Sequence, residues 1–189
     1  RAHLVEKGWL DRTFISMDER SMKQMQAAIK VIHDYAPGLK ISLAGYYHPE
    51  IEKDLWDYSV NNNGGKEFPE GVVERRRSEG KKSTYYTCCS AEYPNVFTFT
   101  DPADCEYVAL HSLKIDVDGY LRWAYNSWTI DPNKDSRFRS WPSGDTYIIY
   151  PDNTSSIRWE RLVQGIESFE KWQIMMADAK AKNDKGMQR

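Results

Sequence analysis

The chain has 189 residues, and 40% of them are hydrophobic, which is enough to build a globular core. Its formal net charge of −2 lacks the basic excess of proteins that bind a nucleic-acid backbone, so we expect no nucleic-acid partner. The mean hydropathy is −0.73, and no apolar run approaches the roughly 20 residues of a membrane-spanning helix, so we expect no membrane span.

The first predicted element is a short buried strand over residues 13–17. It ends on two neighbouring acids, Asp18 and Glu19. Ser21 and Gln24 then have the spacing of a capping box, at the start of a helical pattern that continues to residue 36. The beginning of the chain therefore predicts a strand, an acidic pair and a helix.

A second strand is predicted over residues 40–46, followed by a short helical segment that starts at His48. Residues 54–60 predict a third strand, although a continuing helix is an alternative there. Residues 61–65 predict a loop. A charged helix over residues 70–79 follows, and we interpret its run of three arginines, 75–77, as a solvated face.

The second half continues the alternation. A strand rich in Thr and Tyr is predicted over residues 82–89. Asp101 and Pro102 have the residue types of an N-cap and a first helical position, and predict a helix to about residue 117. A fifth strand over residues 119–126, a long loop and a last helix over residues 156–179 complete the pattern.

Strands that alternate with helices predict a parallel sheet covered by helices. Five strands are too few for a closed eight-stranded barrel. The chain is therefore either an open α/β sheet or strands four to eight of a (β/α)8 TIM-type barrel. No Gly-rich dinucleotide or phosphate-binding motif follows a strand, which favours the barrel. We expect residues 1–179 to be the C-terminal part of the barrel domain, with 180–189 a polar tail and an N-terminal part missing.

The three cysteines do not predict a metal site, because no Cys-x-x-Cys spacing is present. Their odd number argues against a framework of disulfides. We interpret Cys88, Cys89 and Cys105 as small buried side chains.

In a parallel α/β fold the functional face is where the strands end. Aromatic residues make up 13% of the chain, and flat rings suit the faces of sugars, although they also fill cores. The candidate substrate-binding residues at predicted strand ends and in the loops after them are Tyr47, Trp56, Tyr86, Trp123, Asn126, Trp128, Asp145 and Tyr150. Carboxylates, hydroxyls, an amide and rings on one face predict a sugar site.

The adjacent acids Asp18 and Glu19 indicate a particular route of glycosidic cleavage. In ordinary double displacement two carboxyl groups face each other across the bond, which neighbours on one strand cannot easily do. They fit a reaction in which the 2-acetamido oxygen of the sugar attacks the anomeric carbon. One acid then orients the acetamido N–H, and the other acts as general acid and then base.

The chain resembles family 123 glycoside hydrolases, the substrate-assisted β-N-acetylgalactosaminidases. The most specific segments are residues 119–128, 144–151, 155–162 and 165–170. The Met17-Asp18-Glu19 motif resembles the Asp-Glu pair that ends the fourth barrel strand in this family. The resemblance implies that Asp18 positions the acetamido group, that Glu19 is the acid/base, and that configuration is retained. It implies a glycan or glycoconjugate substrate and no metal or organic cofactor.

Three other interpretations remain open. The same face could bind carbohydrate without catalysis, as a binding or scaffold domain. The chain could belong to a barrel hydrolase with a plain hexose substrate and a conventional carboxylate pair. It could also be an open α/β domain of unrelated function.

Overall fold

The computed structural model describes residues 1–61, 68–91, 93–182 and 186. The chain forms two compact units that interleave along the sequence. The first comprises Arg1–Tyr86 and Val117–Leu121, and the second comprises Thr87–Asp116 and Arg122–Arg189. Most of the predicted loop at residues 61–65 lies outside the described residues.

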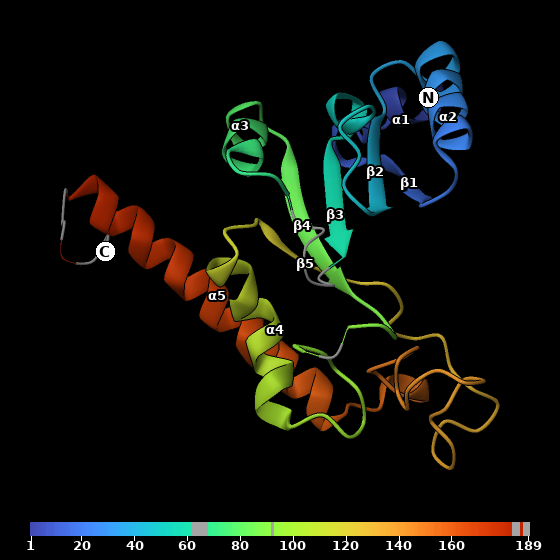
Figure 1. Ribbon diagram of the computed structural model, residues 1–189, viewed down its shortest axis with the longest axis vertical. Helices are drawn as coiled ribbons and strands as arrows, with labels where there is room; N and C mark the ends of the chain where they lie inside the picture. Colours follow the sequence, from blue (N-terminus) through green and yellow to red (C-terminus); the bar gives the residue numbers. More distant parts are fainter. Residues whose placement is uncertain (62–67, 92, 183–185, 187–189) are drawn as a thin grey trace. The chain divides into compact units, whose positions relative to one another are not determined.

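The first unit contains the first three helices and the five strands, except for the last residue of each of the last two strands (Figure 1). Its elements are α1 (Ala2–Glu6), η1 (Leu10–Arg12), β1 (Phe14–Asp18), α2 (Met22–Tyr35), β2 (Lys40–Gly45), η2 (Glu52–Asp54), β3 (Asp57–Asn61), α3 (Val72–Ser78), β4 (Lys82–Thr87) and β5 (Gly119–Arg122). The elements η1 and η2 are single turns of 3-10 helix.

The five strands form one sheet in the order β1-β2-β3-β4-β5. The pairs β1–β2, β2–β3 and β3–β4 are parallel, and the register sets Asp18 beside Ala44 and Gly45 beside Val60. A doubly wound sheet reverses its strand order at a switch point, whereas a barrel adds its strands in one direction. The order of this sheet is therefore that of a barrel segment, and the expected α/β class is confirmed.

The core of the first unit lies between α2 and the sheet. The capping box predicted at the start of α2 is present, because Ser21 and Gln24 satisfy each other's backbone groups. Helical spacing then turns one face of α2 inward. The buried cluster consists of Met25, Ile29, Ile32, Ile41, Leu43, Ile51, Leu55 and Tyr58.

Two expectations about the first unit were wrong. β1 is largely exposed, with Phe14 at 47% and Ile15 at 37%, because among the described strands it pairs with β2 alone. The arginine run 75–77 is not a solvated face, because Arg76 is fully buried. In addition, β3 begins at Asp57 rather than at residue 54, because η2 occupies the preceding turn.

The second unit is built from two packed helices and a long irregular segment. Its elements are α4 (Pro102–Lys114), η3 (Pro151–Asn153) and α5 (Ile157–Ala181). Asp101 caps α4 by accepting a hydrogen bond from the Ala103 N–H, as its type and position predicted. The two helices cross where Gly165 faces the backbone of Glu106, and a Cβ on Gly165 would lie only 2.1 Å from the Glu106 carbonyl oxygen. Figure 1 shows α4 against α5.

The irregular segment replaces part of the predicted fifth strand. β5 ends at Arg122, and beyond it Asn126 forms an isolated antiparallel bridge with Tyr147. α5 extends to Ala181, so the first residues of the expected polar tail are helical, while most of residues 183–189 lie outside the described chain. None of the described helices is long and apolar enough to cross a membrane.

Candidate active site at the carboxyl end of β1

The two candidate catalytic carboxylates lie at the carboxyl edge of the sheet. Asp18 is the last residue of β1, and Glu19 follows it directly. The parallel register places this pair beside Ala44 and Gly45, where β2 ends. Side chains from the segment after β2 can therefore contact the acids.

Asp18 is the more exposed of the two acids. Its side chain is 73% exposed, and its Oδ2 pairs with Nη1 of Arg20 at 2.5 Å. Its Oδ1 accepts the Glu19 N–H at 2.9 Å. An ion pair this exposed contributes little free energy. A pocket of about 200 Å³ lies beside it, lined by Met17, Asp18, Arg20, Gln24, Met25 and Ala28.

Glu19 lies in a more enclosed environment. Its side chain is 28% exposed, and Oε1 lies 3.1 Å from Nε2 of His48. The stem of Glu19 packs directly over Gly45, where a Cβ would come within 2.9 Å of the Glu19 Cβ. The neighbouring acids therefore differ in setting: Asp18 faces solvent, whereas Glu19 is held by a histidine and a glycine.

The segment that carries His48 is fixed by a buried phenol. The Tyr58 hydroxyl donates to the Tyr46 carbonyl at 2.6 Å and accepts the His48 N–H at 2.7 Å. Tyr58 is fully buried, and this burial raises the pKa of its phenol well above the ordinary range. The hydroxyl therefore keeps its proton, and with it both hydrogen bonds.

Tyr47 packs into the core beside this segment. Its ring stacks on Tyr58 with centroids 5.7 Å apart and meets Phe68 edge-on. Burial, followed by the charge of Glu52, raises the pKa of the Tyr47 phenol. The partly buried ring supports Tyr58, and the expected role of Tyr47 in binding substrate stays a prediction.

Tyr86 lies at the same edge, whereas Trp56 does not. Tyr86 is the penultimate residue of β4, and its hydroxyl accepts a hydrogen bond from the side-chain amide of Asn61 at the end of β3. Trp56 precedes β3 and contacts Phe14 and Lys40, which begin β1 and β2. The expected position of Trp56 was therefore wrong, because β3 starts after it and leaves it at the amino edge.

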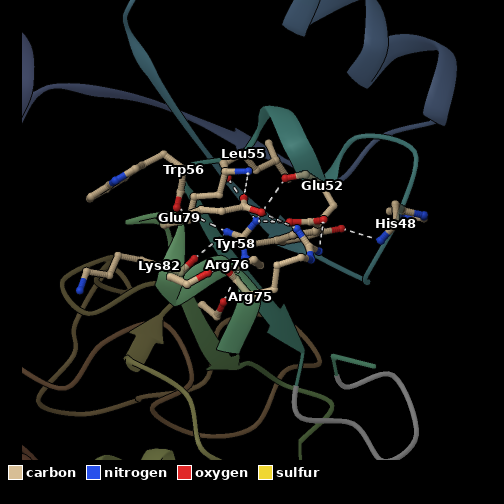
Figure 2. A network of polar contacts seen from close by, with 12 residues as sticks. His48, Glu52, Leu55, Trp56, Tyr58, Arg75, Arg76, Glu79 and Lys82 are labelled. Carbon is tan, nitrogen blue, oxygen red and sulfur yellow. Dashed lines mark hydrogen bonds and ion pairs between the residues drawn. The ribbon is translucent and has the colours of Figure 1, made fainter. Parts of the chain in front are cut away.

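A buried ion pair joins α3 to the turn η2 and to the start of β4 (Figure 2). Arg76 donates to Glu52 Oε1 at 2.8 Å, to Ser83 Oγ at 3.0 Å and to the Lys82 carbonyl at 2.7 Å. Arg75 donates to Glu52 Oε2 at 2.6 Å. Burial opposes ionisation of Glu52, but the hydrogen bonds from both arginines outweigh it and hold the pKa of that carboxyl below its usual range.

In the second unit, Asp145 holds Trp123 rather than facing solvent. Asp145 is 1% exposed, and its Oδ1 accepts from Arg122 at 2.9 Å and from Trp123 Nε1 at 3.3 Å. Trp123 meets Trp141 edge-on with centroids 5.0 Å apart. Burial raises the pKa of Asp145, and Arg122 opposes that rise. The predicted substrate-binding role of Asp145 stays a prediction; its buried carboxylate holds the indole of Trp123, which is 38% exposed.

The other candidates of the second unit lie along the irregular segment. Asn126 is exposed at its bridge with Tyr147. Trp128 is 44% exposed and anchored by an Nε1–H bond to the Ile149 carbonyl at 2.8 Å. Tyr150 is half-buried and meets Tyr147 edge-on. Anchored, exposed indoles can serve as sugar platforms, and this role stays a prediction.

The cysteines differ from the expectation of three buried thiols. Cys105 is buried, and burial raises the pKa of its thiol to about 11. Cys88 is half-buried and Cys89 is exposed, because β4 ends at Thr87, just before them. Within the described part of the chain, no three His, Cys, Asp or Glu side chains gather in a metal-binding group.

Sequence reasoning missed His48, Tyr58 and Gly45 as parts of this site. His48 was not among the candidate site residues, although its position shortly after a strand end was a usable signal. Gly45 showed no local signal, since its role is to make room for Glu19, which precedes it by a whole helix.

Comparisons with known proteins identify the family of the chain. The chain matches the family described as glycoside hydrolase 123, catalytic domain, over residues 1–175. The chain therefore belongs to the glycoside hydrolase family 123 catalytic domains.

A solved structure gives the same assignment. It is a family 123 glycoside hydrolase from Clostridium perfringens, described as revealing the details of glycolipid glycan hydrolysis. Sequence identity is 30% and the TM-score is 0.83. The match covers 99% of this chain but 35% of that protein, so the chain spans about a third of its solved relative. No curated protein matches the chain.

Proposed function

We propose that this chain forms part of a glycosidase that removes terminal β-linked N-acetylhexosamine, with N-acetylgalactosamine as the preferred sugar. The observation that supports the proposal most directly is the pair of adjacent carboxylates at the end of β1, one exposed and one held by His48. Adjacent acids cannot flank a glycosidic bond from opposite sides, as ordinary double displacement requires.

The proposed reaction uses the sugar's own acetamido group as nucleophile. Asp18 accepts the acetamido N–H, which orients the carbonyl oxygen and stabilises positive charge as that oxygen attacks C1. Glu19 donates its proton to the glycosidic oxygen as the C1–O bond breaks. Water then attacks C1 of the oxazolinium intermediate and gives a proton to Glu19, so configuration is retained after two inversions.

The proposed substrate is a glycan or glycoconjugate. The related Clostridium perfringens protein is described in terms of glycolipid glycan hydrolysis, and anchored indoles such as Trp123 and Trp128 suit a sugar face. Because the chain spans about a third of that relative, we propose that segments of the protein outside this chain complete the sugar pocket.

The test uses the full-length protein with three p-nitrophenyl substrates: the β-N-acetylgalactosaminide, the β-N-acetylglucosaminide and the β-galactoside. The variants are Asp18→Asn and, as a matched control on α2, Asp34→Asn, whose carboxylate pairs only with Lys30 among the described residues. We expect turnover of acetamido sugars alone, at least about 100-fold slower in Asp18→Asn and unchanged in Asp34→Asn.

Turnover of the plain galactoside would contradict substrate assistance and favour a conventional carboxylate pair. Binding of glycans without any turnover would favour a carbohydrate-binding role. A thiazoline analogue of the oxazolinium intermediate should inhibit the wild type, because it mimics the proposed intermediate.

A further inference from the structure

We propose that His48 is a positioning residue for Glu19: its Nε2–H donates to Oε1, which leaves Oε2 to carry the proton that is transferred to the leaving group. This inference rests on the proposed role of Glu19 as acid/base, and it assigns the two carboxyl oxygens of that residue different tasks.

The assignment follows from the hydrogen-bond chemistry of the pair. Nε2 of His48 and Oε1 of Glu19 are 3.1 Å apart, and the two side chains are 30% and 28% exposed. An ionised carboxylate can only accept hydrogen bonds, so Nε2 carries the proton when Glu19 is ionised. When Oε2 is protonated, Oε1 remains an acceptor. The same hydrogen bond therefore persists in both states of the catalytic cycle, and His48 need not exchange its proton.

His48 can orient Glu19 because its own backbone is fixed. The His48 N–H donates to the Tyr58 hydroxyl at 2.7 Å, and that hydroxyl donates to the Tyr46 carbonyl at 2.6 Å. Figure 2 shows the bond between Tyr58 and the His48 backbone. Tyr58 is fully buried, with its ring stacked on Tyr47 and the Arg76 guanidinium 5.7 Å from its centroid. The imidazole therefore projects from a segment tied to the core.

The pair also bridges two separate strands. Glu19 follows β1, whereas His48 follows β2, 29 residues later. As the proposed acid, Glu19 must come within hydrogen-bond distance of the leaving-group oxygen. An unrestrained Glu side chain has several rotamers, and few of them would meet this requirement. The histidine restricts this freedom and holds Oε2 in one direction, so we expect its loss to affect proton donation more than substrate binding.

The first test compares leaving groups in the full-length protein. The 2,4-dinitrophenolate group departs with little protonation of the glycosidic oxygen, whereas p-methoxyphenol requires a proton from the general acid. With β-N-acetylgalactosaminides of both, we expect His48→Ala to lower kcat at least about 10-fold more for p-methoxyphenol, with KM changed less than about 3-fold. His48→Gln, which keeps an amide N–H donor, should restore part of this loss, and Tyr58→Phe should reproduce it more weakly. The control is His33→Ala, on the exposed face of α2.

The second test needs no turnover. Selective ¹⁵N labelling of histidine, with His48 assigned from the His48→Gln spectrum, should show the Nε2–H tautomer, with an Nε2 signal that shifts in Glu19→Leu. An Nδ1–H tautomer, or equal losses for both leaving groups, would overturn the proposal. If the wild type cleaves no glycoside, the proposed function fails, and the tautomer still decides whether His48 binds Glu19 as described.

Discussion

The stem of Glu19 occupies the space that Gly45 leaves by having no side chain. A Cβ on Gly45 would lie 2.9 Å from Cβ, 3.1 Å from Cδ and 3.2 Å from Cγ of Glu19. Gly45 ends β2 and lies beside Val60 in the sheet, so its backbone is fixed by strand pairing. Glu19 is therefore placed by a sheet residue beneath it and by His48 at its tip.

Gly45→Ala should displace Glu19 and reduce activity. The new methyl group would contact the stem of Glu19 rather than a flexible end, so the carboxyl group must shift. A displacement near 1 Å at a reacting group costs about 100-fold in rate, and we expect kcat to fall by roughly 10- to 100-fold. Kinetics of the full-length variant on the preferred acetamido sugar would measure this.

The matched control is Gly119→Ala in β5. A Cβ there meets only Thr84 Cγ2 at an ordinary 3.8 Å, so activity should be close to that of the wild type. Equal activity of both variants would show that Glu19 has room to adapt, and would remove Gly45 from the site.

Arg76→Met should be strongly destabilising. Arg76 is fully buried, and its removal would leave the Glu52 carboxylate, 7% exposed, with Arg75 as its remaining described charge partner. Breaking a buried pair costs about 3–5 kcal/mol, and urea denaturation of the full-length protein would measure the loss. Arg137→Met, at an exposed pair with Asp135, should change stability little. Similar effects of the two substitutions would contradict a structural role for the Arg76 network.

The same ion pair gives stability a defined pH dependence. The pKa of Glu52 in the folded protein is lowered from 4.5, so its contribution is fully present above that value and is lost as pH falls through the lower folded-state pKa. The difference in unfolding free energy between the wild type and Glu52→Gln should therefore be largest near neutral pH and shrink in acid. Urea denaturation at several pH values would measure this difference. A difference that grew in acid would mean that Glu52 is protonated in the folded protein.

Local signals predicted much of the fold, and long-range contacts explain what they missed. The capping box of Ser21 and Gln24 and the Asp101 cap depend on residues two or three positions apart, so the sequence shows them directly. The alternation of strands and helices likewise predicted the parallel sheet. By contrast, Arg76 has the charge pattern of a surface helix, and its burial depends on Glu52, which lies 24 residues earlier.

The residues of the candidate site likewise separate into those that local sequence signals predict and those that depend on long-range contacts. The position of Asp18 and Glu19 at a strand end follows from the strand pattern and the acids themselves. The contact between Glu19 and His48 joins residues 29 positions apart, and it depends on strand register and on the Tyr58 hydroxyl. The misplacement of Trp56 had a smaller cause: the turn η2 delays the start of β3 by three residues relative to the predicted strand.

Trp123→Ala should weaken glycan binding more than a comparable change elsewhere. Trp123 is 38% exposed, and Asp145 orients its indole through the Nε1–H. An aromatic contact is worth about 0.5–1.5 kcal/mol beyond area burial, so we expect Kd to rise roughly 2- to 10-fold in calorimetric titrations of the full-length protein with product sugar. Trp172→Ala on α5, where the indole is 45% exposed, is the matched control and should leave Kd unchanged. Equal Kd values for the wild type and Trp123→Ala would mean that this ring serves packing against Trp141 and does not contact the sugar.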